Sequence, residues 1–241
     1  MFDFELPDQT TCQTAFGFNG TYAKQYHGVS AEADVRKLAD LYLDELAKRR
    51  ISPYELHDEI IYPELTYTWP NAPEPGVRVP EGDLDRVFQP EFDWASWDAE
   101  MTRLLDTYHF NTFVLLTPGL GGGAGWSGRA DTGVMLGYTD DMPEYRAAFR
   151  NWYHAVQEHL REKGWLEMAY IFWFDEPVPE QYDFVMKYNL LMKEAAPDLQ
   201  RMLSDRVKPE LIGGPNLWCA LVDEYDHEEA MAQRARSEDR F

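Results

Sequence analysis

The alternation of apolar segments with amphipathic ones constrains the fold of this chain more than any other feature of its sequence. Residues 112–117 and 169–174 form short apolar runs that indicate buried strands. Each run is followed by a segment with apolar side chains at helical spacing, at residues 143–163 and 180–196. Parallel strands need long crossover connections, so the alternation predicts an α/β fold with a parallel sheet covered by helices.

Weaker patterns extend this alternation over the rest of the chain. We expect further strands at residues 10–19, 51–57, 200–204 and 216–221, and further helices at residues 30–50, 92–108 and 224–241. The chain has no internal repeat and no clear linker, which favours one domain spanning residues 1–241. Its length of 241 residues is close to the roughly 250 residues of a (β/α)₈-type TIM barrel. Only six strands are expected, so the barrel is predicted to be incomplete.

A proline-rich segment at residues 58–91 interrupts the alternation. It contains Pro70, Pro73, Pro75 and Pro80 and has little hydrophobic periodicity. It is much longer than the usual connection of roughly 4–6 residues. We expect a long insertion with local structure or a function of its own.

Composition limits the classes of partner. The chain has 22 Lys and Arg against 43 Asp and Glu, a formal net charge of −21, which disfavours nucleic acid and anionic membranes. No apolar run approaches the roughly 18 residues of a membrane span, and the N-terminus lacks the pattern of a signal peptide, so the localisation stays open. The aromatic content of 15% hints at a carbohydrate-binding cleft.

The most informative strand end is the segment 170–177, with the sequence YIFWFDEP. In parallel α/β folds, reacting groups collect where strands end. Asp175 and Glu176 follow the apolar strand directly, and repulsion between adjacent carboxylates favours keeping one of them protonated, as a general acid requires. Glycosidic cleavage uses such a division of roles. The competing interpretation is that Asp175 caps the next helix and Glu176 is a solvated loop residue.

Four segments resemble the catalytic domain of glycoside hydrolase family 123 and related barrel proteins. They are residues 4–7 (FELP), 14–17 (TAFG), 170–177 (YIFWFDEP) and 217–226 (LWCALVDEYD), of which only the Asp-Glu-Pro strand end is specific. The resemblance implies a (β/α)₈ barrel that cleaves terminal β-linked N-acetylhexosamine, N-acetylgalactosamine in that family. It also implies a substrate-assisted retaining mechanism, with Glu176 as general acid/base and Asp175 orienting the 2-acetamido group.

The chain departs from the family pattern in two places. The family has a β-sandwich ahead of the barrel and two more strands after the Leu-Trp segment, whereas this sequence begins near the first barrel strand and stops near the sixth. The alternative hypothesis is therefore a truncated, non-catalytic carbohydrate-binding barrel remnant. A third interpretation is an unrelated α/β enzyme whose Asp-Glu pair binds a divalent metal.

Other side chains are weaker candidates for substrate binding. Asn19, His57 and Asp205 fall at expected strand ends, where they could bind sugar hydroxyls or serve as turn and cap residues. Three tryptophans could stack on a pyranose ring. They are Trp126, Trp173 and Trp218. For Trp173, core packing is the competing interpretation.

No cofactor or metal site is predicted from the motifs. The segment 119–128 is glycine-rich, but it lacks a phosphate-binding or dinucleotide-binding pattern, and we interpret it as a loop over the barrel mouth. His154 and His159 are five residues apart, which does not match a zinc-binding helix face. Cys12 and Cys219 are expected to be small core residues. The expected partner is a carbohydrate substrate, and the oligomeric state stays open.

Overall fold

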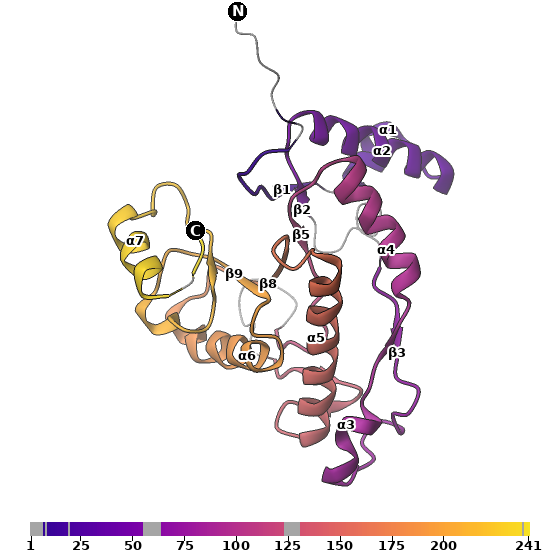
Figure 1. Cartoon of the computed structure of the whole chain (residues 1–241), viewed down its shortest axis with the longest axis vertical. Coiled ribbons are helices and arrows are strands. Elements are labelled where there is room, and N and C mark those ends of the chain that lie inside the picture. Colours follow the sequence, from indigo (N-terminus) through magenta and orange to yellow (C-terminus); the bar gives the residue numbers. More distant parts are fainter. Residues whose placement is uncertain (1–6, 8, 19, 55–63, 123–130, 238) are drawn as a thin grey trace, which may run out of the picture. The chain divides into compact units, whose positions relative to one another are not determined.

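The chain is an α/β protein, as the sequence predicts. The computed structural model describes residues 7, 9–18, 20–54, 64–122, 131–237 and 239–241, and Figure 1 labels their α-helices and most of their strands. The strands are β1 (Phe16–Gly17), β2 (Pro53–Tyr54), β3 (Tyr67–Thr68), β4 (Glu91–Phe92), β5 (Phe113–Val114), β6 (Val134–Met135), β7 (Tyr138–Thr139), β8 (Ala169–Asp175), β9 (Gln200–Ser204) and β10 (Leu217–Trp218). The α-helices are α1 (Gly20–His27), α2 (Glu32–Lys48), α3 (Leu84–Val87), α4 (Trp94–Thr102), α5 (Pro143–Lys163), α6 (Tyr182–Ala195) and α7 (His227–Arg236). Short 3₁₀ segments are η1 (Glu81–Asp83), η3 (Pro179–Gln181) and η4 (Pro209–Leu211), and η2 (Arg103–Thr107) is a π-helical turn.

The chain divides into two compact units. The first comprises Met1–Tyr67 and Phe92–Val114, and the second comprises Thr68–Glu91 and Leu115–Phe241. The Asp-Glu-Pro strand end and all of β8, β9 and β10 belong to the second unit. The single domain expected over residues 1–241 stays a prediction.

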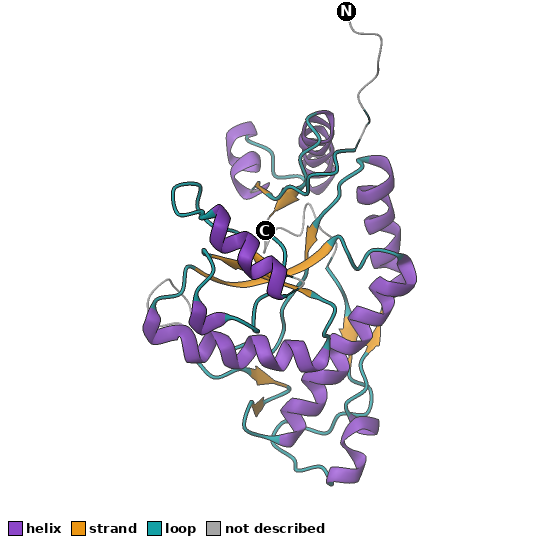
Figure 2. Ribbon diagram, turned by 60° about the vertical axis from the view of Figure 1, so that its left-hand side comes forward, coloured by secondary structure: helices purple, strands orange, loops and turns teal. Residues whose placement is uncertain are grey.

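The largest sheet contains four parallel strands in the order β10–β9–β8–β5. Tyr170 of β8 lies opposite Gln200 of β9, and Met202 of β9 lies opposite Leu217 of β10. In Figure 2 the strands of the sheet are orange and the helices that connect them along the chain are purple. Because the strands are parallel, the carboxyl ends of β8, β9 and β10 lie at one edge of the sheet. A closed (β/α)₈ barrel stays a prediction.

A βα unit follows β10 and returns the chain to the sheet. Helix α7 begins at His227 and ends at Arg236, and the side chain of its N-cap residue Asp226 accepts a hydrogen bond from the Glu229 amide. Arg240 then forms a parallel bridge with Leu217, and the Trp218 amide donates to the Arg240 carbonyl at 2.9 Å. The helix expected at residues 224–241 is therefore shorter, and its last residues are extended beside β10.

Helix α5 follows the predicted range closely because its sequence contains both end signals. Pro143 occupies the first turn, where its missing N–H costs nothing, and Gly164 ends the helix in the left-handed region with φ of 73°. The side chains at 145, 149, 152, 156 and 160 lie on one face and are all buried. The spacing that predicted the helix is thus the spacing of its core contacts.

The first unit contains a short helix that the sequence patterns do not predict. Helix α1 starts at Gly20, where the Asn-Gly pair suggested a loop, and it packs on α2. In the same unit, β1 and β2 pair in parallel, and Arg103 donates to Asp40 at 2.9 Å and to Glu100 at 3.0 Å. The helix expected at residues 92–108 is α4 followed by η2.

The described part of the proline-rich segment has local structure. It includes β3, η1, α3 and β4, and its residues 68–91 belong to the second unit. The buried carboxylate of Glu144 on α5 accepts hydrogen bonds from Arg78 at 3.0 Å and from the Val79 amide at 3.1 Å. These bonds outweigh the burial of Glu144 and lower its pKa. A charged side chain of the helix thus holds a segment that lacks apolar periodicity.

Several predicted strands are shorter in the structure. Strand β5 covers only Phe113–Val114 of the expected residues 112–117, and β10 covers only Leu217–Trp218 of the expected 216–221. An unpredicted hairpin joins β6 to β7 through Leu136 and Gly137, whose φ values of 55° and 79° allow a tight two-residue turn. Among the described residues, no helix combines the length and apolar character needed to cross a membrane.

Candidate active site

The carboxyl end of β8 presents the two acidic side chains expected from the sequence. Asp175 is the last residue of β8 and is half-buried, whereas Glu176 is exposed. Glu176 has φ of 44°, in the left-handed region that non-glycine residues rarely adopt. The residue before a proline normally prefers extended backbone, so the position of Glu176 before Pro177 adds to the strain. Such strain costs about 1–3 kcal/mol and persists where the surrounding structure enforces it.

Ser204, the last residue of the neighbouring strand β9, binds both acidic residues. Its hydroxyl donates a hydrogen bond to Oδ1 of Asp175 and accepts one from the Glu176 amide at 3.2 Å. One side chain therefore fixes the Asp175 carboxylate and the backbone of Glu176. The Glu176 carboxylate has no hydrogen-bond partner among the residues that the structure describes. One acid is held in place and the other is free to approach a ligand.

Cys219, immediately after β10, brings a third strand end to this site. Its amide donates to the Leu203 carbonyl at 2.9 Å, which fixes it beside the end of β9. Burial of the thiol and, to a smaller extent, the negative charge of Asp175 raise the pKa of Cys219. The thiol is therefore neutral at physiological pH and lies close enough to Asp175 to sense its charge. Cys12 and Cys219 were both expected in the core, but each is exposed as a residue, although the thiol of Cys219 is partly buried.

A hydrophobic cluster of the second unit supports these strand ends. It contains Phe174, Val185, Leu203, Val207, Leu211 and Trp218, all buried. Trp173 packs against this cluster and contacts the rings of Phe184 and Tyr188, with centroid distances of 5.8 and 5.4 Å. The core interpretation of Trp173 thus describes its contacts better than the sugar-stacking interpretation.

Trp218 and Asp205, two other candidates from the sequence, are buried and bound to neighbouring residues of the protein. Trp218 is 2% exposed, and its indole N–H donates to Asp239 at 3.0 Å, so its ring cannot stack on a sugar in this conformation. Asp205 is buried, accepts a hydrogen bond from the Arg206 amide and pairs with Lys208 at 3.0 Å. The expectation that Trp218 stacks on a sugar is corrected here because the side chain fills the core, and Asp205 matches the competing interpretation of a turn residue.

The remaining sequence candidates lie outside the described residues. They are Asn19, His57 and Trp126, and the same holds for residues 123–130 of the glycine-rich segment. Their assignment to substrate binding stays a prediction.

Gly119, at the start of the glycine-rich segment, and Gly133, which follows that segment, are bound to helices α5 and α6. The Gly133 amide donates to the hydroxyl of Tyr188, and that hydroxyl donates to Asp140, which also pairs with Lys187 at 2.6 Å. Tyr145 donates to the Gly119 carbonyl at 2.8 Å. Burial raises the pKa of both tyrosines. The tyrosines therefore act as neutral donors that fix the connection leaving β5.

Glycine is required at two positions of this arrangement. A Cβ atom on Gly121 would lie 2.4 Å from the Asp131 carbonyl and 2.6 Å from the Tyr188 hydroxyl, and one on Gly133 would lie 2.2 Å from the Gly119 carbonyl. The glycines thus permit a close approach of the backbone to Tyr188. Sequence reasoning found the glycines but not their partners, because Tyr188 is 55 residues from Gly133 and local spacing does not pair them.

The described residues contain no cluster of three or more His, Cys, Asp and Glu side chains that could hold a metal ion. The polar groups at the carboxyl ends of the strands are instead an exposed glutamate, a fixed aspartate and a serine donor. This set can donate and accept protons and can orient an N–H group of a ligand.

Comparison with known proteins adds no assignment to this geometry. A scan of the sequence against models of protein families found no match, and a search of curated protein sequences found none either.

Proposed function

We propose that the protein is a glycoside hydrolase that cleaves a terminal β-linked N-acetylhexosamine, N-acetylgalactosamine being the expected sugar. The single observation that supports this most is the division of roles between two adjacent carboxylates. Ser204 holds Asp175, whereas the Glu176 carboxylate is exposed and free of protein partners among the described residues. Two sequence neighbours cannot easily flank a sugar as the acid and nucleophile of a conventional retaining pair do, roughly 5–5.5 Å apart. Adjacent carboxylates on one side of the sugar are enough for a reaction in which the substrate's own 2-acetamido group is the nucleophile.

In the proposed first step, Glu176 donates a proton to the glycosidic oxygen as the bond between that oxygen and the anomeric carbon breaks. The carbonyl oxygen of the 2-acetamido group attacks the anomeric carbon and forms an oxazolinium ion. Asp175 accepts a hydrogen bond from the acetamido N–H and stabilises the positive charge that develops there. The leaving group departs as an alcohol with the proton from Glu176.

In the proposed second step, the Glu176 carboxylate removes a proton from a water molecule that attacks the anomeric carbon. The bond between the anomeric carbon and the acetamido oxygen breaks, and the sugar is released with its original β configuration. Glu176 regains its proton and Asp175 is unchanged. The two inversions at the anomeric carbon give net retention.

A panel of 4-nitrophenyl β-glycosides tests the proposal. We expect release of 4-nitrophenol from the 2-acetamido-2-deoxy galactoside or glucoside, and at least about 100-fold slower release from the matching 2-hydroxy sugars, which lack the internal nucleophile. Hydrolysis of the 2-hydroxy sugars at equal rates would contradict substrate assistance. Saturable binding of N-acetylgalactosamine without hydrolysis of any substrate would support the non-catalytic alternative.

A further inference from the structure

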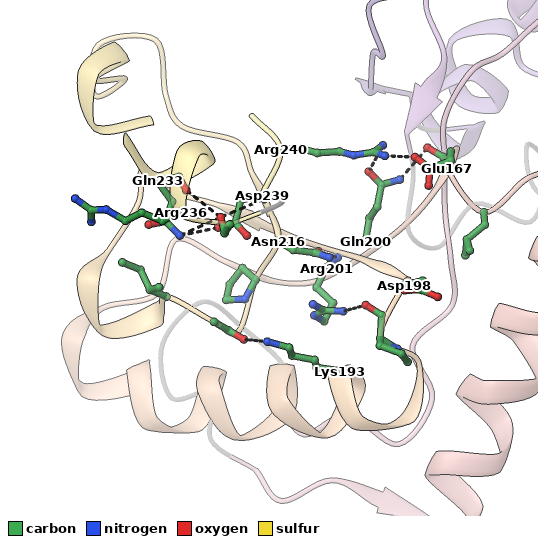
Figure 3. A pocket seen from close by; sticks show the side chains of 16 residues that line it. Glu167, Lys193, Asp198, Gln200, Arg201, Asn216, Gln233, Arg236, Asp239 and Arg240 are labelled. Atoms are coloured by element: carbon green, nitrogen blue, oxygen red, sulfur yellow. Dashed lines mark hydrogen bonds and ion pairs between the residues drawn. The ribbon is translucent and has the colours of Figure 1, made fainter. Parts of the chain in front are cut away.

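A polar cavity lies at the amino ends of strands β8, β9 and β10, opposite the ends that carry Asp175 and Glu176. It has a volume of about 620 Å³, and Figure 3 shows its lining side chains. Its lining includes residues that precede or begin strands, namely Glu167 before β8, Gln200 at the start of β9 and Asn216 before β10. The cavity is therefore at the amino ends of the strands, away from Asp175 and Glu176 at their carboxyl ends.

Arg201 is the most unusual side chain of this cavity. It is 3% exposed, and its guanidinium group donates to backbone carbonyls only: Nε to Gly214 at 3.0 Å, and Nη1 to Pro197 at 3.2 Å and Leu199 at 2.9 Å. Burial lowers its pKa to about 10, so the group still carries its charge at neutral pH. No carboxylate of the described residues forms an ion pair with it.

One nitrogen of this guanidinium group is free to bind a ligand. Nη2 donates no hydrogen bond to the described residues, and it is not sealed from solvent. Arg201 extends from β9 toward α6, and Lys193 extends from α6 into the same cavity (Figure 3). Lys193 donates to the Gly213 carbonyl at 3.1 Å and has no ion-pair partner among the described residues, so it also retains unused donors.

Each carboxylate of the cavity has partners within the protein, and the charges of Asp239 and Asp198 also act on Arg201. Glu167 pairs with Arg240, Asp198 pairs with Arg161 at 2.5 Å, and Asp239 accepts hydrogen bonds from Trp218 and Gln233, each at 3.0 Å. The lining contains four cations, Lys193, Arg201, Arg236 and Arg240, against three carboxylates. In a chain with a net charge of −21, this locally positive cavity is suited to an anion.

We propose that this cavity binds a small oxyanion, a phosphate or carboxylate group, through Nη2 of Arg201 and Nζ of Lys193. The buried guanidinium supplies a fixed, charge-assisted donor, and the lysine supplies a second positive charge from the opposite wall. The site is separate from the proposed hydrolase site and does not depend on that function.

Calorimetric titration of the whole chain with inorganic phosphate tests the proposal, with sodium acetate and glucose 6-phosphate as further arms at constant ionic strength. We expect saturable binding of one equivalent of at least one of these anions, and the arm that binds distinguishes a phosphate ligand from a carboxylate ligand. Lys193→Met is expected to weaken that binding at least about tenfold, because it removes one charge-assisted hydrogen bond. Arg206→Met is the control, because Arg206 does not line this cavity.

A labelling experiment tests the proposal on the unaltered protein, so that the result does not depend on whether a variant folds. Acetylation of each lysine is followed by mass spectrometry with and without saturating phosphate, acetate or glucose 6-phosphate. Protection of Lys193, with Lys37 unchanged, supports the site. Absence of saturable binding of all three anions would overturn the proposal, as would binding that protects no lysine or is unchanged in Lys193→Met.

Discussion

The carboxyl and amino ends of strands β8, β9 and β10 use polar side chains in opposite ways. At the carboxyl ends, Asp175 is half-buried and Glu176 is exposed. Glu176 also adopts a strained backbone conformation. At the amino ends, Arg201 is buried and fixed by three carbonyl oxygens. Exposed, strained and poorly bound groups are typical of sites that act on ligands, whereas extensively bound groups hold the fold. The difference predicts that substitutions of Asp175 and Glu176 affect hydrolysis with little effect on stability, whereas loss of Arg201 lowers stability in addition to the proposed anion binding.

The largest effect is expected from Glu176→Gln, which removes the proposed acid without changing the size of the side chain. Hydrolysis of a 2-acetamido disaccharide should fall by roughly 10²–10⁴-fold, the usual contribution of general acid catalysis. The loss should be smaller for the 4-nitrophenyl glycoside, whose leaving group needs little protonation. Initial rates of the variant and of the original protein on both substrates measure the fall for each substrate.

Glu180→Gln is the matched control for this substitution. Glu180 is also an exposed glutamate near the end of β8, and it has no hydrogen bond among the described residues. We expect rates within about twofold of the original protein. Equal losses in both variants would show that the position of Glu176 has no special role.

The next largest effect is expected from Arg201→Met, on stability. The substitution removes the donor from two buried carbonyl groups, of Gly214 and Leu199, and from the partly buried carbonyl of Pro197. A buried polar group that loses its partner costs about 1–3 kcal/mol. We therefore expect the free energy of unfolding to fall by at least about 3 kcal/mol. Urea titrations measure the change, and Arg206→Met, which removes an exposed arginine, should change it by less than about 0.5 kcal/mol.

Tyr188→Phe tests the anchor of the backbone at Gly133, which follows the glycine-rich segment. It removes the hydroxyl that binds Asp140 and the Gly133 amide and leaves the ring in place. We expect the free energy of unfolding to fall by about 1–3 kcal/mol, because two buried groups lose a partner. Tyr182→Phe is the comparison, since no hydrogen bond of that hydroxyl exists among the described residues. Equal stability of the two variants contradicts the anchoring role.

Ser204→Ala tests whether Ser204 acts as a positioning residue for Asp175 and Glu176. We expect kcat to fall about tenfold, equivalent to about 1.4 kcal/mol, with little change in KM. Ser204→Thr keeps the hydroxyl and should recover most of the rate. A purely structural role predicts instead that loss of stability accompanies loss of activity and that KM changes as well.

The smallest effect concerns the pH dependence of Cys219. Its raised pKa predicts that the rate of iodoacetamide labelling reaches half its maximum above the usual thiol value of about 8.5. Asp175→Asn removes the negative charge that contributes to this shift, so the profile should move to lower pH. Both profiles are measured in a Cys12→Ser background. An unchanged profile contradicts the proximity of the two side chains.

The sequence predicts the elements of the second unit better than the contacts between them. Helix α5 could be predicted because Pro143, Gly164 and a buried face at helical spacing all agree. Strand β8 could be predicted because residues 169–174 form an apolar run and the strand ends at Asp175, two residues before Pro177. These are local signals, and each is strong enough to determine its own element.

The contacts of the candidate site depend on pairing between distant segments, which local spacing does not reveal. Ser204 meets Asp175 because β9 lies beside β8 in one register, and the Glu176 backbone takes a left-handed conformation although it precedes a proline. Trp218 has the aromatic character of a sugar platform, but its neighbours in the core decide its exposure. The strand end that carries the candidate acids was therefore predictable, while the surroundings of the candidate residues were not.

The configuration of the first product tests the central claim most directly. Proton NMR during hydrolysis of 4-nitrophenyl 2-acetamido-2-deoxy-β-galactoside distinguishes the two anomers of the released sugar before they interconvert. The account predicts that the β anomer forms first, because the acetamido group and then water each attack the anomeric carbon with inversion. Initial release of the α anomer, or no release of the sugar, would contradict the proposed roles of Asp175 and Glu176.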